Sequence, residues 1–272
     1  MNPKRVLEAY GLEPRKSLGQ NFLHDPNVLE KIAASAELTP LSTVLEIGAG
    51  TGALTDVLAR HAGRVIALEL DARLEPILRE RLRDYDNVQL VFADVLETDI
   101  AALLGSEDYV VVANVPYYIT SAIIRHLLES TNRPRRLVMT VQLEVAERIV
   151  ARPGDMSLLA VSVQYYMRPK IVMRLNPAVF YPRPDVTSAV IRLDAPAEPP
   201  VQVPDEASFF AVVRAGFSQK RKQLKNTLAT GLRLSNEQAL TLLERAGIDP
   251  RRRAETLSLD EWAALTRAFV SV

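Results

Sequence analysis

Four consecutive residues, Asn114, Val115, Pro116 and Tyr117, combine a side-chain amide, a rigid imino acid and an aromatic ring. The Asn side chain offers one acceptor oxygen and two N–H donors. Pro116 fixes its own φ and disfavours helical backbone at Val115, so the Val115 carbonyl can point into a cleft. Tyr117 supplies a flat face on which a base could stack. Two acceptors beside a ring would suit the exocyclic amine of a purine.

The elements around this stretch place it at a ligand-binding edge. Residues 109–113 form an apolar run that predicts a buried parallel strand, and the spacing of residues 119–128 predicts a helix. In open α/β sheets, ligands bind beyond the carboxyl ends of the strands. The alternative interpretation is an ordinary strand-to-helix turn, in which Asn114 caps the helix and Tyr117 packs in the core.

A glycine-rich turn follows another predicted strand. Residues 43–47 read as a strand, Gly48, Gly50 and Gly52 follow, and a helix is expected to continue to about residue 61. Glycines allow the backbone to approach a ligand closely at a helix N-terminus. The spacing differs from the dinucleotide-binding fingerprint, because the third glycine comes one residue early.

Two carboxylates end the next two predicted strands. Glu69 closes the strand at residues 64–70, and it comes 21 residues after Gly48, an offset at which an acid can bind ribose hydroxyls. Asp94 follows the strand at residues 88–92 and could accept from an adenine amino group, or simply cap a helix. Together with Asn114, these strand ends suit a neutral or cationic nucleoside better than a pyrophosphate.

Four motifs carry a resemblance to a known family. Residues 46–52, Glu-Ile-Gly-Ala-Gly-Thr-Gly, resemble motif I of the S-adenosylmethionine-dependent methyltransferases. Residues 114–117 are similar to the (Asn/Asp)-Pro-Pro-Tyr motif of amino-methyltransferases, in the form that rRNA adenine N6-dimethyltransferases carry. Residues 20–23 resemble that family's motif at the methionine end of the cofactor, and residues 180–188 resemble its last catalytic-domain motif.

The resemblance implies a set of site residues and S-adenosyl-L-methionine as cofactor. It places the cofactor over Asn21, Leu23, Gly48, Glu69, Asp94 and Asn114. It implies catalysis by Asn114, Tyr117 and Phe180, with the two rings on either side of an extruded base. It implies no metal. From spacing alone, Gln20 and Asn21 would be ordinary loop residues.

Within the family, residues 180–182 look most like the small-subunit (16S) rRNA enzyme of bacteria, which forms N6,N6-dimethyladenosine during ribosome biogenesis. The expected partner is therefore small-subunit rRNA or a partly assembled small subunit. Val115 and residues 157–159 depart from that branch's usual residues. Open alternatives are a large-subunit rRNA methyltransferase of the macrolide-resistance type, a DNA adenine methyltransferase, and a non-catalytic RNA-binding assembly factor.

Two domains are expected. Residues 1–195 would form the catalytic domain, an α/β Rossmann-like methyltransferase sheet with late strands at 158–166 and 171–175. Residues 196–204 read as a linker, and residues 205–272 as a small all-helical RNA-binding domain. Its predicted helices span 208–217, 220–229, 235–246 and 258–269, and its basic clusters are residues 220–222 and 251–253.

The amino-acid composition excludes several kinds of site and of protein. The 272 residues include 33 basic and 33 acidic side chains and no cysteine, which excludes disulfides, Cys-based metal sites and a Cys nucleophile. Residues from Pro200 onward carry 11 basic and 8 acidic side chains, so an RNA surface must be a local patch. No apolar run approaches 18 residues, so no membrane span is expected. A cytoplasmic monomer is the expectation.

Overall fold

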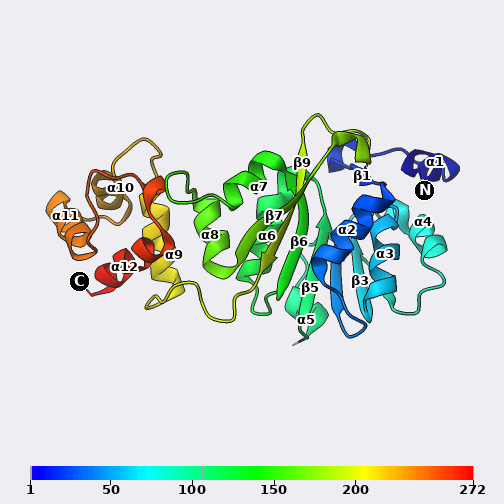
Figure 1. The fold of residues 1–272 in the computed structure, drawn as a ribbon, viewed down its shortest axis with the longest axis horizontal. Helices are drawn as coiled ribbons and strands as arrows, with labels where there is room; N and C mark the ends of the chain where they lie inside the picture. Colours follow the sequence, from blue (N-terminus) through cyan, green and yellow to red (C-terminus); the bar gives the residue numbers. More distant parts are fainter. Residues whose placement is uncertain (1, 106, 272) are drawn as a thin grey trace. The chain divides into compact units, whose positions relative to one another are not determined.

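A seven-stranded sheet is the centre of the computed structural model, which describes residues 2–105 and 107–271 (Figure 1). The strand order is β4-β3-β2-β5-β6-β9-β7. The first five strands of this order pair in parallel, and β9 is antiparallel to β6. The strands are β2 (Thr43–Ile47), β3 (Arg64–Glu69), β4 (Val88–Phe92), β5 (Tyr109–Asn114), β6 (Arg136–Gln142), β7 (Arg168–Leu175) and β9 (Ser188–Asp194). The predicted Rossmann-like sheet is confirmed.

Helices cover both faces of this sheet because the strand order reverses between β2 and β5. Right-handed crossovers on opposite sides of that point place their helices on opposite faces. One face packs beneath α2 (Pro26–Ala36), α3 (Ala53–His61) and α4 (Glu75–Arg81), in a core that includes Val44, Val65 and Val110 (Figure 1). The crossover after β5 is α6 (Thr120–Glu129). Residues 109–113 are all buried, as expected for a strand covered on both faces.

Short elements complete this part of the chain. They are α1 (Pro3–Ala9), α5 (Ile100–Leu104) and α7 (Leu143–Ile149). A side-chain cap fixes the start of α2: the Asp25 carboxylate accepts from the backbone N–H of Asn27 and Val28 at 2.9 and 3.1 Å, and Pro26 opens the helix. No helix within the described residues is long and apolar enough to cross a membrane.

A two-stranded sheet joins segments that are far apart in the sequence. β1 (Phe22–Leu23) pairs antiparallel with β8 (Phe180–Tyr181), with Phe22 opposite Tyr181 and Leu23 opposite Phe180 (Figure 1). The motif at residues 20–23 and the motif at residues 180–188 therefore meet at one place.

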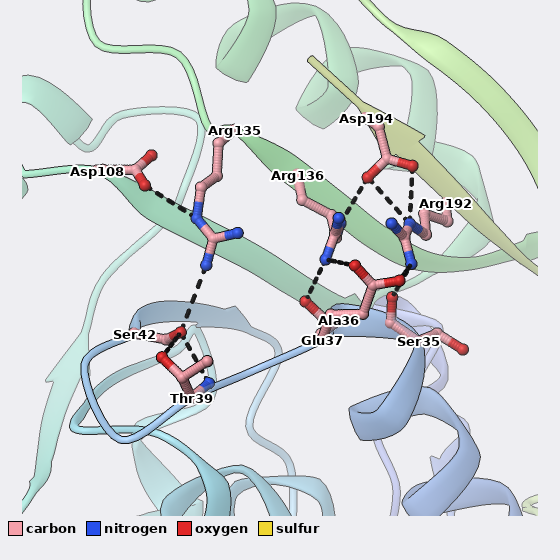
Figure 2. Close-up of polar contacts among 10 residues, drawn as sticks. All are labelled: Ser35, Ala36, Glu37, Thr39, Ser42, Asp108, Arg135, Arg136, Arg192 and Asp194. Atoms are coloured by element: carbon pink, nitrogen blue, oxygen red, sulfur yellow. Dashed lines mark hydrogen bonds and ion pairs between the residues drawn. The ribbon is translucent and has the colours of Figure 1, made fainter. Parts of the chain in front are cut away.

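An ionic cluster fixes the C-terminal end of α2 to β6 and β9 (Figure 2). Arg136 contacts Glu37 at 2.8 Å and Asp194 at 2.5 Å. Arg192 contacts Asp194 at 2.7 Å and also pairs with Glu37. The two arginines donate to the last carbonyls of the helix, Arg136 to Ala36 at 2.8 Å and Arg192 to Ser35 at 3.1 Å. These contacts satisfy carbonyls that a helix end leaves without partners.

The described chain divides into two compact units. The first comprises the residues up to Ala146 together with Pro169–Ala195, and the second comprises Glu147–Arg168 together with the residues from Pro196 onward. The second unit is helical: α8 (Leu158–Tyr166), α9 (Glu206–Gly216), α10 (Leu224–Gly231), α11 (Asn236–Arg245) and α12 (Leu259–Val270). Capping boxes begin α11 and α12, formed by Ser235 with Gln238 and by Ser258 with Glu261.

Three expectations for this region differ from the structure. Residues 158–166 form α8 rather than a strand: Ser157 caps the helix by accepting from the Ala160 N–H at 3.2 Å. On its buried face, Ala160 and Val161 pack in the core of the helical unit, so tertiary packing outweighs the strand propensity of residues such as Val161 and Tyr165. Consequently residues 147–168 lie outside the sheet unit, although the expected domain of residues 1–195 included them. α10 also starts at Leu224, so the basic residues 220–222 precede the helix.

Candidate functional site

A cleft lies at the carboxyl ends of β2, β3, β4 and β5. Seven of the predicted site residues line it: Asn21, Leu23, Gly48, Glu69, Asp94, Asn114 and Tyr117. They come from five separate stretches of the chain, and the sheet topology brings them together. This is the position at which doubly wound sheets bind ligands.

The glycine loop between β2 and α3 forms one wall of the cleft. Gly48, Gly50 and Gly52 have φ values of +82°, +58° and +77°, which favour glycine. A Cβ on Gly48 would lie 2.7 Å from the backbone oxygen of Asn114. The loop therefore needs glycine at position 48 both for its conformation and for the close approach of β2 to β5.

Glu69 ties this loop to the next strand end. Its Oε2 accepts from the Gly50 N–H at 2.8 Å, and its Oε1 accepts from the Asp71 N–H at 2.8 Å. Burial raises the pKa of Glu69, and these backbone N–H donors oppose the rise. Each oxygen keeps a further lone pair, so the carboxylate can still accept from a ligand hydroxyl.

Asp94 lines the same cleft beyond β4. One of its oxygens, Oδ1, accepts from the Leu96 N–H at 2.9 Å, as in the turn-capping role considered from the sequence. The cap uses one oxygen, and the other accepts no hydrogen bond from the described residues. Asp94 can therefore orient its own turn and accept from a ligand amine.

Asn114 is oriented by the loop before β1. Its Nδ2 donates to the backbone oxygen of Asn21 at 3.3 Å, and the Nδ2 of Asn21 donates to the Gly19 oxygen at 3.1 Å. Because the amide nitrogen is engaged, Oδ1 is the atom left to accept from a ligand. The N-cap of α6 is Ile119, so the alternative in which Asn114 caps that helix is wrong.

Gln20 anchors the loop that carries Asn21. Its Nε2 donates to Asp71 Oδ2 at 2.9 Å, and its Oε1 accepts from the Arg15 N–H at 2.7 Å. Asp71 also accepts from Arg73, whose Nη2 lies 2.6 Å from Oδ2, and this contact holds the pKa of Asp71 below its usual range. The position of Asn21 thus depends on β3, a link that sequence reasoning missed.

The Tyr117 hydroxyl is fixed by Ser188 on β9, with 2.5 Å between the two oxygens. Ser188 is fully buried. Burial raises the pKa of Tyr117, and the hydrogen bond from Ser188 opposes the rise, so the phenol is neutral at physiological pH. Sequence reasoning missed Ser188 as a partner, although it ends the motif at residues 180–188.

Phe180 does not join the other predicted residues on the cleft wall. Its side chain is 3% exposed and belongs to the hydrophobic core beside Leu23 and Leu175. The adjacent Tyr181 instead lines a second groove, which shares Gly19, Gln20, Asn21 and Tyr117 with the cleft. The pairing of β1 with β8 brings Phe180 beside the site but leaves its ring covered.

The comparisons with known proteins agree on one family. The model for ribosomal RNA adenine dimethylase matches residues 11–269. Ribosomal RNA small subunit methyltransferase A of Dehalococcoides mccartyi (strain ATCC BAA-2266 / KCTC 15142 / 195) is 47% identical over 267 residues, covering 98% of this chain and 92% of that protein.

Two solved structures are similar over most of their length. A dimethyladenosine transferase from Plasmodium falciparum has a TM-score of 0.80 and 26% identity, covering 92% of this chain and 98% of that one. The 23S rRNA methyltransferase ErmE has a TM-score of 0.73 and 30% identity, covering 91% of this chain and 98% of that one. With a cleft built from the motifs of S-adenosylmethionine-dependent enzymes, the chain belongs to the ribosomal RNA adenine dimethylase family and is an S-adenosylmethionine-dependent adenine N6-dimethyltransferase.

Proposed function

We propose that this enzyme methylates N6 of adenines in small-subunit rRNA during ribosome biogenesis, giving N6,N6-dimethyladenosine. The observation that carries the proposal is the orientation of Asn114: its nitrogen is held by Asn21, and its oxygen is left for an amine. The small-subunit assignment is supported by the name of the 47% identical relative. Cytoplasmic localisation, a monomeric state and a mechanism without metal are parts of the same proposal.

The residues proposed to hold the cofactor are Asn21, Leu23, Gly48, Glu69 and Asp94. The glycine loop lines the cleft, and Gly48 and Gly50 have no side chains that would keep a ligand away from its backbone. The carboxylates of Glu69 and Asp94 suit ribose hydroxyls and an adenine amine. Bound there, S-adenosylmethionine supplies an electrophilic methyl group on a sulfonium.

The protein has to promote attack by the N6 amine of adenine, a poor nucleophile, on the methyl group. The adenine amine has its lone pair delocalised into the ring. Asn114 Oδ1 and the Val115 carbonyl would accept the two N–H hydrogens and favour a pyramidal nitrogen. Such positioning, with acceptors aimed at the amine, supplies most of the acceleration. No general base is needed before transfer, because the amine proton becomes acidic only afterwards.

Tyr117 would stack on the target base, since its hydroxyl is fixed by Ser188 and its ring lines the cleft. We keep Phe180 as the proposed second ring. Because Phe180 is 3% exposed, this role requires its ring to leave the core when RNA binds. The second methylation requires one acceptor to be released and room for the first methyl group.

Methyl transfer from labelled S-adenosylmethionine to unmethylated small ribosomal subunits tests the proposal, with large-subunit RNA and duplex DNA in parallel. Nucleoside analysis should find N6,N6-dimethyladenosine in the small subunit alone. Label in large-subunit RNA would support the second candidate function, a large-subunit rRNA adenine methyltransferase. The observation in favour of that candidate is the 30% identity to the 23S rRNA methyltransferase ErmE. Cofactor binding without label in any substrate would support an assembly factor instead.

A further inference from the structure

The second groove extends from Tyr117 away from the cofactor cleft. Its walls are α1 with the following loop, the end of β6, and the segment after β8. Its lining includes Lys4, Arg15, Lys16, Tyr117, Tyr181 and Arg183. Because both depressions share Tyr117 and Asn21, a chain that delivers a base to Tyr117 can continue along this groove.

The charges along the groove distinguish two of its cations from the rest. Lys4 lies 3.8 Å from Glu8, and Arg15 lies 3.9 Å from Asp71, so both already have partners within the protein. Lys16 and Arg183 are exposed, and neither forms an ion pair or side-chain hydrogen bond within the part of the chain that the structure describes. The remaining carboxylates of the lining are Glu13 and Asp185.

The rest of the groove suits unstacked nucleotides. Tyr181 presents a half-buried ring on which a base could stack, and Pro182 and Pro184 make its wall stiff. Gln142, opposite Ser188 in the β6–β9 pairing, contributes a side-chain amide at the Tyr117 end. A duplex cannot present a base to Tyr117 without extruding it, whereas a single strand can.

We propose that this groove binds the single-stranded RNA next to the target adenine, with Lys16 and Arg183 holding phosphates and Tyr181 stacking on a neighbouring base. The inference rests on the proposed function, since it names the part of the substrate that this site reads. It assigns RNA contacts to the sheet unit itself, in addition to those expected of the helical unit.

The test compares the double variant Lys16→Gln/Arg183→Gln with the control Lys31→Gln/Arg125→Gln, whose residues are exposed on α2 and α6 and line neither depression. Binding of unmethylated small-subunit rRNA is measured across salt concentrations, together with KM and kcat for methylation and S-adenosylmethionine affinity. Each phosphate contact to a single strand contributes about 0.7 to the slope of log affinity against log salt. With two phosphate contacts removed, the slope for the Lys16→Gln/Arg183→Gln variant should be smaller by about 1.4 than the wild-type slope. Its KM for the RNA should be roughly tenfold higher or more, and its affinity for S-adenosylmethionine should be unchanged.

The two proposals fail in different ways. A wild-type protein that methylates the RNA, with a groove variant that matches the control in slope and KM, would overturn the groove and leave the function standing. A wild-type protein that methylates no small-subunit RNA would overturn the function. If it methylates large-subunit RNA instead, the same variants are compared on that RNA, and an unchanged slope again overturns the groove. A Tyr181→Ala variant, expected to raise KM without changing the salt slope, separates stacking from charge.

Discussion

Asn114 owes its orientation to a residue 93 positions earlier in the chain, because its amide nitrogen donates to the Asn21 carbonyl. A side-chain amide that rotated freely could present either its donor or its acceptor atom to a substrate. The hydrogen bond decides between them and aims an acceptor at the amine. The chemistry of this residue is therefore set by its partner as much as by its type.

Replacing Asn114 with Ala should lower kcat for methyl transfer on the order of 10²-fold or more, by analogy with the loss of one hydrogen-bonding group at a developing charge. Affinity for S-adenosylmethionine should fall much less, because the glycine loop and the two carboxylates remain. Single-turnover methylation and a cofactor titration measure the two effects. An Asn27→Ala variant, exposed on α2, is the matched control. Full methylation by the Asn114 variant would refute the mechanism.

Glu46 is a second residue whose surroundings change its chemistry. It is fully buried in β2, just before the glycine loop, and neither carboxyl oxygen accepts a hydrogen bond from the described residues, although Thr55 is close enough to oppose the shift. Burial raises the pKa of Glu46 from 4.5 to about 8. The carboxyl is therefore mostly protonated in the folded protein at neutral pH.

This shift predicts a pH dependence of stability. Because the folded state holds the proton more tightly than the unfolded state, the contribution of Glu46 is fully present below pH 4.5 and is lost as pH rises to about 8. A Glu46→Gln variant should therefore gain stability relative to wild type across this window. Urea unfolding at intervals from pH 5 to 8.5 measures the difference. A difference that stays constant with pH would show that Glu46 does not titrate there.

At the scale of elements, the glycine loop positions the cofactor cleft through its backbone. A Gly48→Ala variant would have to keep a φ of +82°, and its Cβ would lie 2.7 Å from the backbone oxygen of Asn114. The loop or β5 must therefore shift. Backbone strain of about 1–3 kcal/mol predicts a roughly tenfold or greater loss of S-adenosylmethionine affinity. Gly105→Ala is the control, because its φ is +63° but a Cβ there meets no atom of the described residues within 4 Å.

Calorimetric titration with S-adenosylmethionine should separate the two glycine variants. The Gly105 variant should lose about 1–3 kcal/mol of stability from its backbone conformation (φ +63°, ψ −133°) alone and keep its cofactor affinity. Equal affinities in both variants would mean that the approach of Gly48 to Asn114 has no bearing on the cleft.

The ionic cluster at the end of α2 acts on stability (Figure 2). Arg192 is 8% exposed, and its replacement by Met would leave Asp194 with one cation instead of two and remove the donor to Ser35. The loss should be about 3 kcal/mol, as for other broken buried pairs. Arg60→Met, which removes a surface pair with Glu30 at 3.0 Å, should cost about 1 kcal/mol or less.

Denaturant unfolding of both arginine variants measures this contrast, and methylation assayed well below the unfolding transition should remain near wild type. A loss for Arg192→Met no larger than for Arg60→Met would mean that the cluster stabilises the sheet no more than a surface pair does.

At the scale of the whole molecule, the basic residues 220–222 lie in the turn before α10 of the helical unit, where their side chains are exposed. We expect Lys220→Gln/Arg221→Gln to weaken rRNA binding and to reduce its salt slope by about 1.4. The comparison is Arg214→Gln/Arg245→Gln, which neutralises two exposed arginines of the same unit. Filter binding over a salt series gives the slopes, and equal slopes would place the RNA surface elsewhere.

The sequence by itself determined the four parallel strands that carry the cleft, because four apolar runs and the turns after them specify strands whose carboxyl ends must share one edge. It also pointed to Gly48, Glu69, Asp94 and Asn114 in the cleft, since glycine, carboxylate and amide at successive strand ends suit a nucleoside, whereas Asn21 and Leu23 were predicted only from the family resemblance. The capping boxes of α11 and α12 also follow from local sequence, because their hydrogen bonds join residues only three positions apart.

Tertiary structure decided what depends on distant partners. Residues 158–166 include two valines and two tyrosines, which favour strands, and only packing within the helical unit makes them a helix. The covering of Phe180, the hydrogen bond from Ser188 to Tyr117 and the hold of Asn21 on Asn114 all join segments separated by 70 or more residues. Local sequence carries propensity and motif, whereas burial and partner choice arise only when the sheet assembles.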